Sequence, residues 1–139
     1  MYTKRPDLTH KTIIVMGGTC GFGAECVKRF FTLGARVIFT GTNLKAASSL
    51  KNKILKGTRK NNKLKKENIV FYQCDYNQLI QIKQFTDSIK SKETRIDILL
   101  NNVGTHLTKK ATTFDGNDAL VQINYFGSFY LTDLLLPLL

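Results

Sequence analysis

The feature that most constrains this chain is a group of closely spaced glycines directly after a short apolar segment. After its first residue, Thr12–Met16 is continuously apolar, which is typical of a strand buried on both faces of a parallel sheet. Gly17, Gly21 and Gly23 follow, and a helical apolar pattern begins there. Glycine lets a backbone approach a phosphate closely, and a helix N-terminus directs free N–H groups towards it. The segment therefore predicts a turn that binds a nucleotide diphosphate.

The rest of the chain alternates between apolar segments and amphipathic helical patterns. The predicted strands are Thr12–Met16, Arg36–Thr40, Ile69–Gln73 and Ile96–Leu100, and the predicted helices cover residues 23–34, 44–55, 79–89 and 117–136. Strands that alternate with helices are joined by right-handed crossovers and form a parallel sheet. We therefore expect one α/β domain over residues 1–139, with a doubly wound sheet of the Rossmann type.

The net charge of +11 is concentrated in one stretch. No acidic residue occurs between Asn43 and Lys66, and the basic residues there are Lys45, Lys51, Lys53, Lys56, Arg59, Lys60, Lys63, Lys65 and Lys66. Nucleic acid, an anionic membrane or an acidic protein could bind such a stretch. It lacks interleaved aromatic residues, and Ala47, Leu50 and Ile54 form an inward stripe at helical spacing. A solvated helix followed by a lysine-rich loop is the favoured interpretation, and nucleic acid is not the expected partner.

Composition excludes several other classes of protein. The three cysteines, Cys20, Cys26 and Cys74, include no CxxC pair, so neither a disulfide framework nor a zinc site is expected. The apolar stretch at residues 129–139 is interrupted by a charged residue and a proline and is shorter than the about 20 apolar residues that span a bilayer. The first eleven residues lack the apolar core of a secretory signal. We expect an intracellular protein.

Four separated motifs together resemble the short-chain dehydrogenase/reductase family. Residues 16–23 resemble its TGxxxGxG turn, with Met16 in place of threonine. Asp75 follows the third predicted strand, as does the family's adenine-contacting acid. Residues 101–104 resemble its NNAG motif, with valine for alanine. Residues 115–129 resemble the DG…VNxxGxF helix of the retinol-dehydrogenase-like branch.

The resemblance implies the strand order 3-2-1-4 and a site for NAD or NADP. The residues that it assigns to the cofactor are Gly17, Thr19, Cys20, Gly21, Phe22, Gly23, Asp75, Asn102, Val103 and Gly104. Asn124 would correspond to the catalytic asparagine that aligns the active-site water and lysine. Each assignment has a structural alternative: the glycines could form a plain turn, Asp75 could cap a helix, and the asparagines could close a loop or lie solvated on a helix.

The end of the second predicted strand bears on the choice of cofactor. A carboxylate there accepts hydrogen bonds from the ribose of NAD, whereas basic groups accept the 2′-phosphate of NADP. Residues 40–45 contain no carboxylate, and Thr42 and Lys45 offer a hydroxyl and an ammonium group. NADP is therefore favoured over NAD, although Thr42 stands where related reductases commonly have arginine.

The family's catalytic tyrosine and lysine are absent from this sequence. They follow the pattern YxxxK, and none of the five tyrosines has a lysine four residues later. The resemblance therefore implies the cofactor-binding half of an oxidoreductase that lacks its C-terminal catalytic half. Its substrate would be an alcohol or carbonyl compound, lipid-like by analogy with the retinol-dehydrogenase-like branch. The alternative is a non-catalytic accessory subunit of a large complex, mitochondrial in view of the basic composition.

In that strand order, the fourth predicted strand lies at one edge of the sheet. An open edge beside a large apolar patch promotes pairing or aggregation. We therefore expect another polypeptide, or a further chain segment, to cover strand 96–100 and helix 117–136. A companion that supplies YxxxK beside Asn124 would indicate an enzyme, and one that covers the edge without it would indicate a scaffold.

Overall fold

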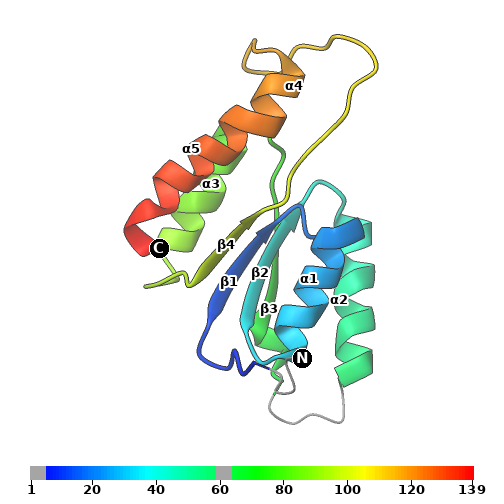
Figure 1. Ribbon diagram of the computed structural model, residues 1–139, viewed down its shortest axis with the longest axis vertical. Helices are drawn as coiled ribbons and strands as arrows, with labels where there is room; N and C mark the ends of the chain where they lie inside the picture. The colour runs from blue at the N-terminus through cyan, green and yellow to red at the C-terminus, as the bar shows by residue number, and fades with distance from the viewer. Residues whose placement is uncertain (1–5, 59–63) are drawn as a thin grey trace.

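The computed structural model describes residues 6–58 and 64–139, which form a sheet covered by helices on both faces (Figure 1). The four parallel strands are β1 (Thr12–Met16), β2 (Arg36–Gly41), β3 (Ile69–Gln73) and β4 (Ile98–Asn101), in the order β3-β2-β1-β4. The prediction of a doubly wound sheet in the order 3-2-1-4 is confirmed. Arg59, Lys60 and Lys63 of the predicted basic stretch lie outside the described residues.

The central strand β1 sends its side chains alternately to two cores, as the continuous apolar run requires. Ile13 and Val15 pack under α1 (Gly21–Thr32) and α2 (Leu44–Thr58). Ile14 and Met16 face the opposite layer, which contains α3 (Leu79–Lys90) and α5 (Gly127–Leu135). Figure 1 shows the two helix pairs on opposite sides of the sheet. Because all four strands are parallel, their carboxyl ends meet at one edge of the sheet.

Helix α2 confirms the predicted inward stripe and runs one turn further than its apolar pattern. Ala47 and Ile54 are buried and Leu50 packs against the same core. The helix reaches Thr58, whose hydroxyl donates to the Ile54 carbonyl at 2.9 Å. The lysines of this helix consequently face outwards.

The last predicted helix, 117–136, is broken in the structure. A short α4 (Ala119–Val121) leads into a π-helical segment, η2 (Gln122–Phe126), before α5 begins. A final 3-10 turn, η3 (Leu136–Leu138), follows, and a similar turn, η1 (Lys66–Asn68), precedes β3. Apolar spacing alone did not reveal the break, because side chains of the π segment bond to loops distant in the sequence.

Strand β4 starts two residues later than predicted. The Ile96 N–H donates to the Leu138 carbonyl at 2.7 Å, and that of Asp97 donates to the Thr12 carbonyl at 2.9 Å. The backbone N–H of Ile96 therefore bonds to η3 instead of to a neighbouring strand. From Ile98 onwards β4 pairs with β1, and its outer edge has no partner strand among the described residues.

The helical region that follows β4 in the chain exposes large apolar side chains. The aromatic ones are Tyr125, Phe126 and Phe129, on η2 and α5. Within the described ranges, no helix combines the length and apolar character needed to cross a bilayer, and no cluster of histidine, cysteine and acidic side chains could hold a metal ion.

Candidate cofactor site

The turn after β1 is held against the end of β2 by its own amides. The Gly18 N–H donates to the Thr40 carbonyl at 2.7 Å, and the Gly17 N–H lies 3.3 Å from the Thr40 hydroxyl oxygen. Gly17 has a φ of 70°, a conformation that side chains disfavour. A Cβ at Gly17 would also lie 2.8 Å from the carbonyl oxygen of Asn102. The turn is thus fixed between β2 and the segment that follows β4.

Gly23 allows the first turn of α1 to lie directly on this loop. A Cβ there would overlap the Gly17 carbonyl oxygen and lie 2.6 Å from the Asn102 Nδ2. Any larger residue must push the helix away from the loop. The predicted glycine spacing therefore has a steric cause at Gly17 and Gly23, as a phosphate-binding turn requires.

The N-terminus of α1 is open to an anion. Cys20 is its N-cap, and within the described part of the chain no side chain caps the helix and no acidic residue occupies its first turn. The first amides of a helix have no acceptor within the helix, and the positive end of the helix dipole adds to their field. Cys20, Gly21 and Phe22 are exposed here. The arrangement can cradle a diphosphate.

The segment after β4 reaches back to this turn. The Asn102 Nδ2 donates to the Gly17 carbonyl oxygen at 3.1 Å, and Val103 packs against the core under α3 and α5. A Cβ at Gly104 would lie 3.7 Å from the Asn124 Oδ1. Two predicted cofactor segments, 17–23 and 102–104, are therefore in contact, and Asn124 adjoins the second.

Asn124 lies in the π segment and bonds to the chain that leaves β4. Its Oδ1 accepts from the Thr105 N–H at 2.7 Å, and its Nδ2 donates to the Thr105 carbonyl at 2.9 Å. The side chain is therefore engaged with a loop instead of simply solvated. π segments often occur at functional sites.

Asp75 follows β3 and is half-buried. Its Oδ1 accepts from the Asn77 N–H at 2.9 Å, and its own N–H donates to the Gln81 Oε1 at 3.0 Å. The carboxylate at the start of α3 is a different one, because the Leu79 N–H donates to the Asp115 Oδ2 at 2.9 Å. Asp75 shapes the loop at the sheet edge and does not cap α3.

Thr42 and Lys45 lie exposed just beyond β2. Thr19 of the turn packs over this strand end, because a Cβ at Gly41 would lie 2.5 Å from its Cγ2. The turn and the β2–α2 connection thus share one surface. Thr42 adds a hydroxyl group to that surface and Lys45 adds a positive charge.

Sequence reasoning missed Gln122, which is fully buried in the π segment. Its Nε2 donates to the Tyr76 carbonyl at 2.9 Å and to the Asp115 Oδ2 at 2.8 Å. Its Oε1 accepts from the Thr113 hydroxyl at 2.9 Å and from the Asn117 Nδ2 at 2.8 Å. The amide's full hydrogen-bonding capacity is used. Gln122 therefore ties the loop after β3 to the loop that precedes Asn124.

The ionisable groups nearest Asp75 do not offer acid–base chemistry at neutral pH. Burial, with a smaller contribution from Asp75, raises the pKa of Cys74 to about 12. Burial likewise raises the pKa of the Tyr76 hydroxyl above its usual value. Both groups therefore stay protonated at neutral pH.

An open glycine turn at the carboxyl edge of a doubly wound parallel sheet defines the Rossmann class of nucleotide-binding folds. A model of the short chain dehydrogenase family matches residues 11–139, so the chain belongs to that family.

Individual relatives agree with this assignment. The chain is 34% identical to polyprenol dehydrogenase from Homo sapiens over 139 residues, which is all of this chain and 39% of that protein. A metagenomic short-chain oxidoreductase solved in complex with NADP has a TM-score of 0.77 and 22% identity, over 94% of this chain and 57% of that one. RhlG from Pseudomonas aeruginosa, also solved with NADP, has a TM-score of 0.74 and 21% identity, over 96% and 49%. The chain thus spans about two-fifths to three-fifths of these proteins.

Proposed function

We propose that this chain binds NADP and forms the cofactor half of an oxidoreductase that acts on an alcohol or carbonyl compound. The observation that carries the proposal is the uncapped N-terminus of α1 beside the turn at Gly17 and Gly23. The relatives support it, because one is named a dehydrogenase and two structural neighbours hold NADP. A bound nicotinamide would supply the hydride acceptor or donor.

The residues present would divide the binding between them. The amides of residues 17–23 would hold the pyrophosphate, and Asp75 would accept a hydrogen bond from the adenine. Residues 102–104 would line the cofactor, since Asn102 already contacts the turn. Asn124 would help to order the proton relay once a tyrosine and a lysine lie beside it. The relative's name makes a lipid-like alcohol the preferred substrate class.

The preference for NADP rests on the charge beyond β2. Thr42 and Lys45 are exposed there, and residues 40–45 include no carboxylate. We expect the 139-residue chain to bind NADPH about fivefold more tightly than NADH, and Lys45→Gln to remove most of that difference, as expected for one exposed ion pair. Titration followed by nicotinamide fluorescence measures both affinities. Lys51→Gln is the matched control on the same helix, and equal affinities for NADPH and NADH in the unmodified chain would contradict the preference.

A second candidate is a non-catalytic accessory subunit of a large mitochondrial complex. The outer edge of β4, which has no partner strand among the described residues, favours it. In either case another polypeptide or chain segment would cover β4 and the helical region 117–136, inside the cell. Crosslinking from this surface, followed by sequencing of the captured chain, separates the two: a captured YxxxK segment supports the enzyme, and its absence supports the scaffold.

A further inference from the structure

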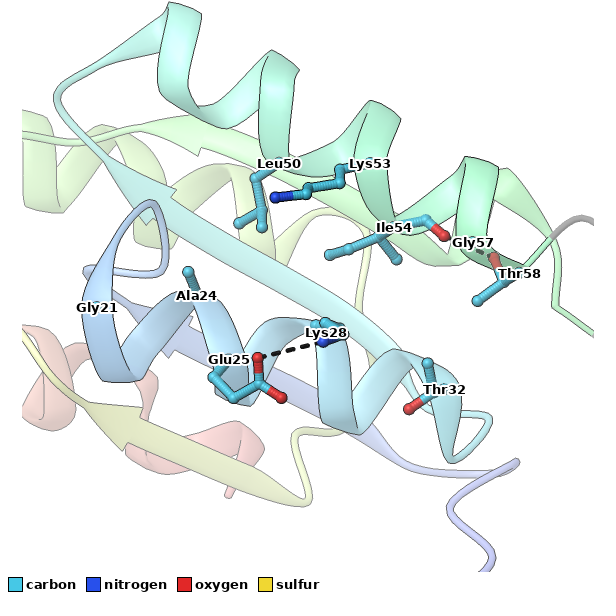
Figure 2. Close-up of a pocket in the computed structure, with 10 residues that line it drawn as sticks. All are labelled: Gly21, Ala24, Glu25, Lys28, Thr32, Leu50, Lys53, Ile54, Gly57 and Thr58. Carbon is cyan, nitrogen blue, oxygen red and sulfur yellow. Dashed lines mark hydrogen bonds and ion pairs between the residues drawn. The ribbon is translucent and has the colours of Figure 1, made fainter.

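A groove runs between α1 and α2 on the face of the molecule away from α3 and α5 (Figure 2). Its volume is about 310 Å³, and its apolar lining includes Ala24 of α1 and Leu50 and Ile54 of α2. Small residues keep it open, because a Cβ at Gly57 would meet no atom within 4 Å. The volume lies at the lower end of the range for small-molecule sites.

The charge around this groove is positive. Lys53 lines it from α2, and its neighbours three and four positions away (Ser49, Leu50, Lys56 and Gly57) include no carboxylate. Among the described residues, Lys53 has no ion-pair partner. Lys28 lines the α1 side, where it is 3.4 Å from Glu25 and thereby offsets that carboxylate. Lys53 therefore supplies the net charge.

We propose that this groove binds a single-chain aliphatic anion, such as a medium-chain carboxylate. The aliphatic part would cover Leu50 and Ile54, and the carboxylate would pair with Lys53. An apolar cavity of 150 Å³ holds one benzene molecule, so a groove of this volume holds about twelve carbon atoms. Among the residues that the structure describes, no aromatic side chain lines it for a base to stack on, which disfavours a nucleotide.

The groove shares Gly21 with the proposed cofactor site, but its other nine lining residues lie outside that site. Gly21 begins α1 and lines one end of the groove. The glycine turn presents amides to a phosphate, whereas the groove presents apolar side chains and an ammonium group. Occupation of one does not require the other, so the two proposals can be tested apart.

The test is a titration of the isotope-labelled 139-residue chain with dodecanoate below its micelle concentration, followed by amide NMR. We expect saturable shifts at Ala24, Leu50 and Ile54. Lys53→Gln should weaken binding about threefold, the size of one exposed ion pair. Lys56→Gln, on the same helix but outside the groove, should leave the affinity unchanged. Uncharged dodecanol should bind the unmodified chain as weakly as dodecanoate binds Lys53→Gln.

Gly57→Leu provides an independent check, because it fills the groove at an exposed position and improves helix propensity. It should abolish the shifts without lowering the melting temperature. Shifts confined to Phe126 and Phe129, equal losses in Lys53→Gln and Lys56→Gln, or the absence of saturation would each overturn the proposal. Saturating NADPH should change the affinity for dodecanoate by less than twofold relative to the chain without NADPH. Failure of the groove proposal and failure of the cofactor proposal therefore give different results.

Discussion

At the scale of the residue, the site depends on the side-chain amide of Asn102 and on glycine at positions 17 and 23. Asn102 donates to the carbonyl oxygen of Gly17, and the absence of a Cβ at Gly23 lets α1 approach both groups. The turn, the helix and the segment after β4 are therefore packed at van der Waals distance. A single added methyl group has no free volume there.

Gly23→Ala is expected to impair both stability and binding. Its Cβ would overlap the Gly17 carbonyl oxygen, which belongs to backbone and cannot rotate away. We expect a loss of about 1–3 kcal/mol in the free energy of unfolding, as overpacking costs elsewhere, and at least a tenfold loss of NADPH affinity. Urea unfolding and fluorescence titration measure the two effects. Gly57→Ala, at an exposed helical position, should instead raise stability by about 0.5–1 kcal/mol.

Gln122→Leu is expected to loosen the loops around Asn124. It would leave the Asp115 carboxylate and the Tyr76 carbonyl without the Gln122 amide. The Tyr76 carbonyl and the Thr113 hydroxyl, which Gln122 also bonds, are buried. Lost hydrogen bonds of buried groups cost about 1–3 kcal/mol each, so we expect a total near 3 kcal/mol and faster amide exchange at Leu79 and Thr105. Gln84→Leu, an exposed position on α3, is the control. Equal stability of the two variants would contradict a central role for Gln122.

At the scale of the element, Asp97 fixes the start of β4 against β1. Its Oδ2 accepts from the Thr12 N–H at 2.9 Å, and its Oδ1 lies 2.9 Å from both the Lys11 ammonium and the Arg95 guanidinium. The hydrogen bond from Lys11, and then that from Thr12, hold the pKa of Asp97 below its ordinary value of 3.8. These contacts stabilise the folded chain while the carboxylate is ionised.

The sign of the resulting pH dependence follows from that lowered pKa. The stabilisation by Asp97 is fully present above the ordinary pKa of an aspartate and is lost as the pH falls through the folded-state value. We therefore expect Asp97→Asn to be less stable than the unmodified chain at pH 7, and the two to converge near pH 2. Urea unfolding at both pH values checks this. Asp133→Asn, an exposed position on α5, should show no such difference.

Elements set by local pattern were predictable from the sequence, and those set by distant partners were not. The strand Thr12–Met16 and the glycine turn follow from apolar continuity and from backbone conformation, and both were predicted at their observed positions. Gln122 contacts Tyr76, 46 positions away in sequence, and Asp115 bonds to Leu79 at a separation of 36. No local pattern encodes such contacts. The π segment escaped prediction for the same reason, because its side chains bond to loops.

The candidate site divides in the same way. The positions of Gly17, Gly23 and Asn102 around one turn were predicted through the family resemblance, and the structure supplies their contacts. The resemblance also pointed to Asp115, but its bond to the start of α3 could be seen only in three dimensions.

At the scale of the whole molecule, one side is unlike the rest of the surface. The outer edge of β4 is unpaired within the described part of the chain. The Asn101 Nδ2 at the end of β4 donates to the Thr132 hydroxyl oxygen of α5 at 3.1 Å, and Phe129 of the same helix is 66% exposed. Exposed edges and large apolar patches mark surfaces that other chains cover. In the opposite layer, α2 instead exposes Lys45, Lys53 and Lys56.

We expect the isolated 139-residue chain to self-associate through this side. Phe129→Lys should shift the equilibrium towards monomer, because a charge resists burial in an apolar contact, and should leave the melting temperature of the monomer unchanged. Sedimentation velocity over a range of concentrations measures the shift. Lys51→Glu on α2 is the control, and a greater effect of that variant on association would place the contact on the other face.

The hydrogen bond from Asn102 to Gly17 links the open edge of the sheet to the glycine turn. Asn102 directly follows the edge strand, so whatever docks against β4 also restrains the floor of the turn. Coupling free energies act equally in both directions. Where a companion at the edge holds the turn in the conformation that binds a dinucleotide, the two would bind with positive cooperativity, each raising the other's affinity by the same factor.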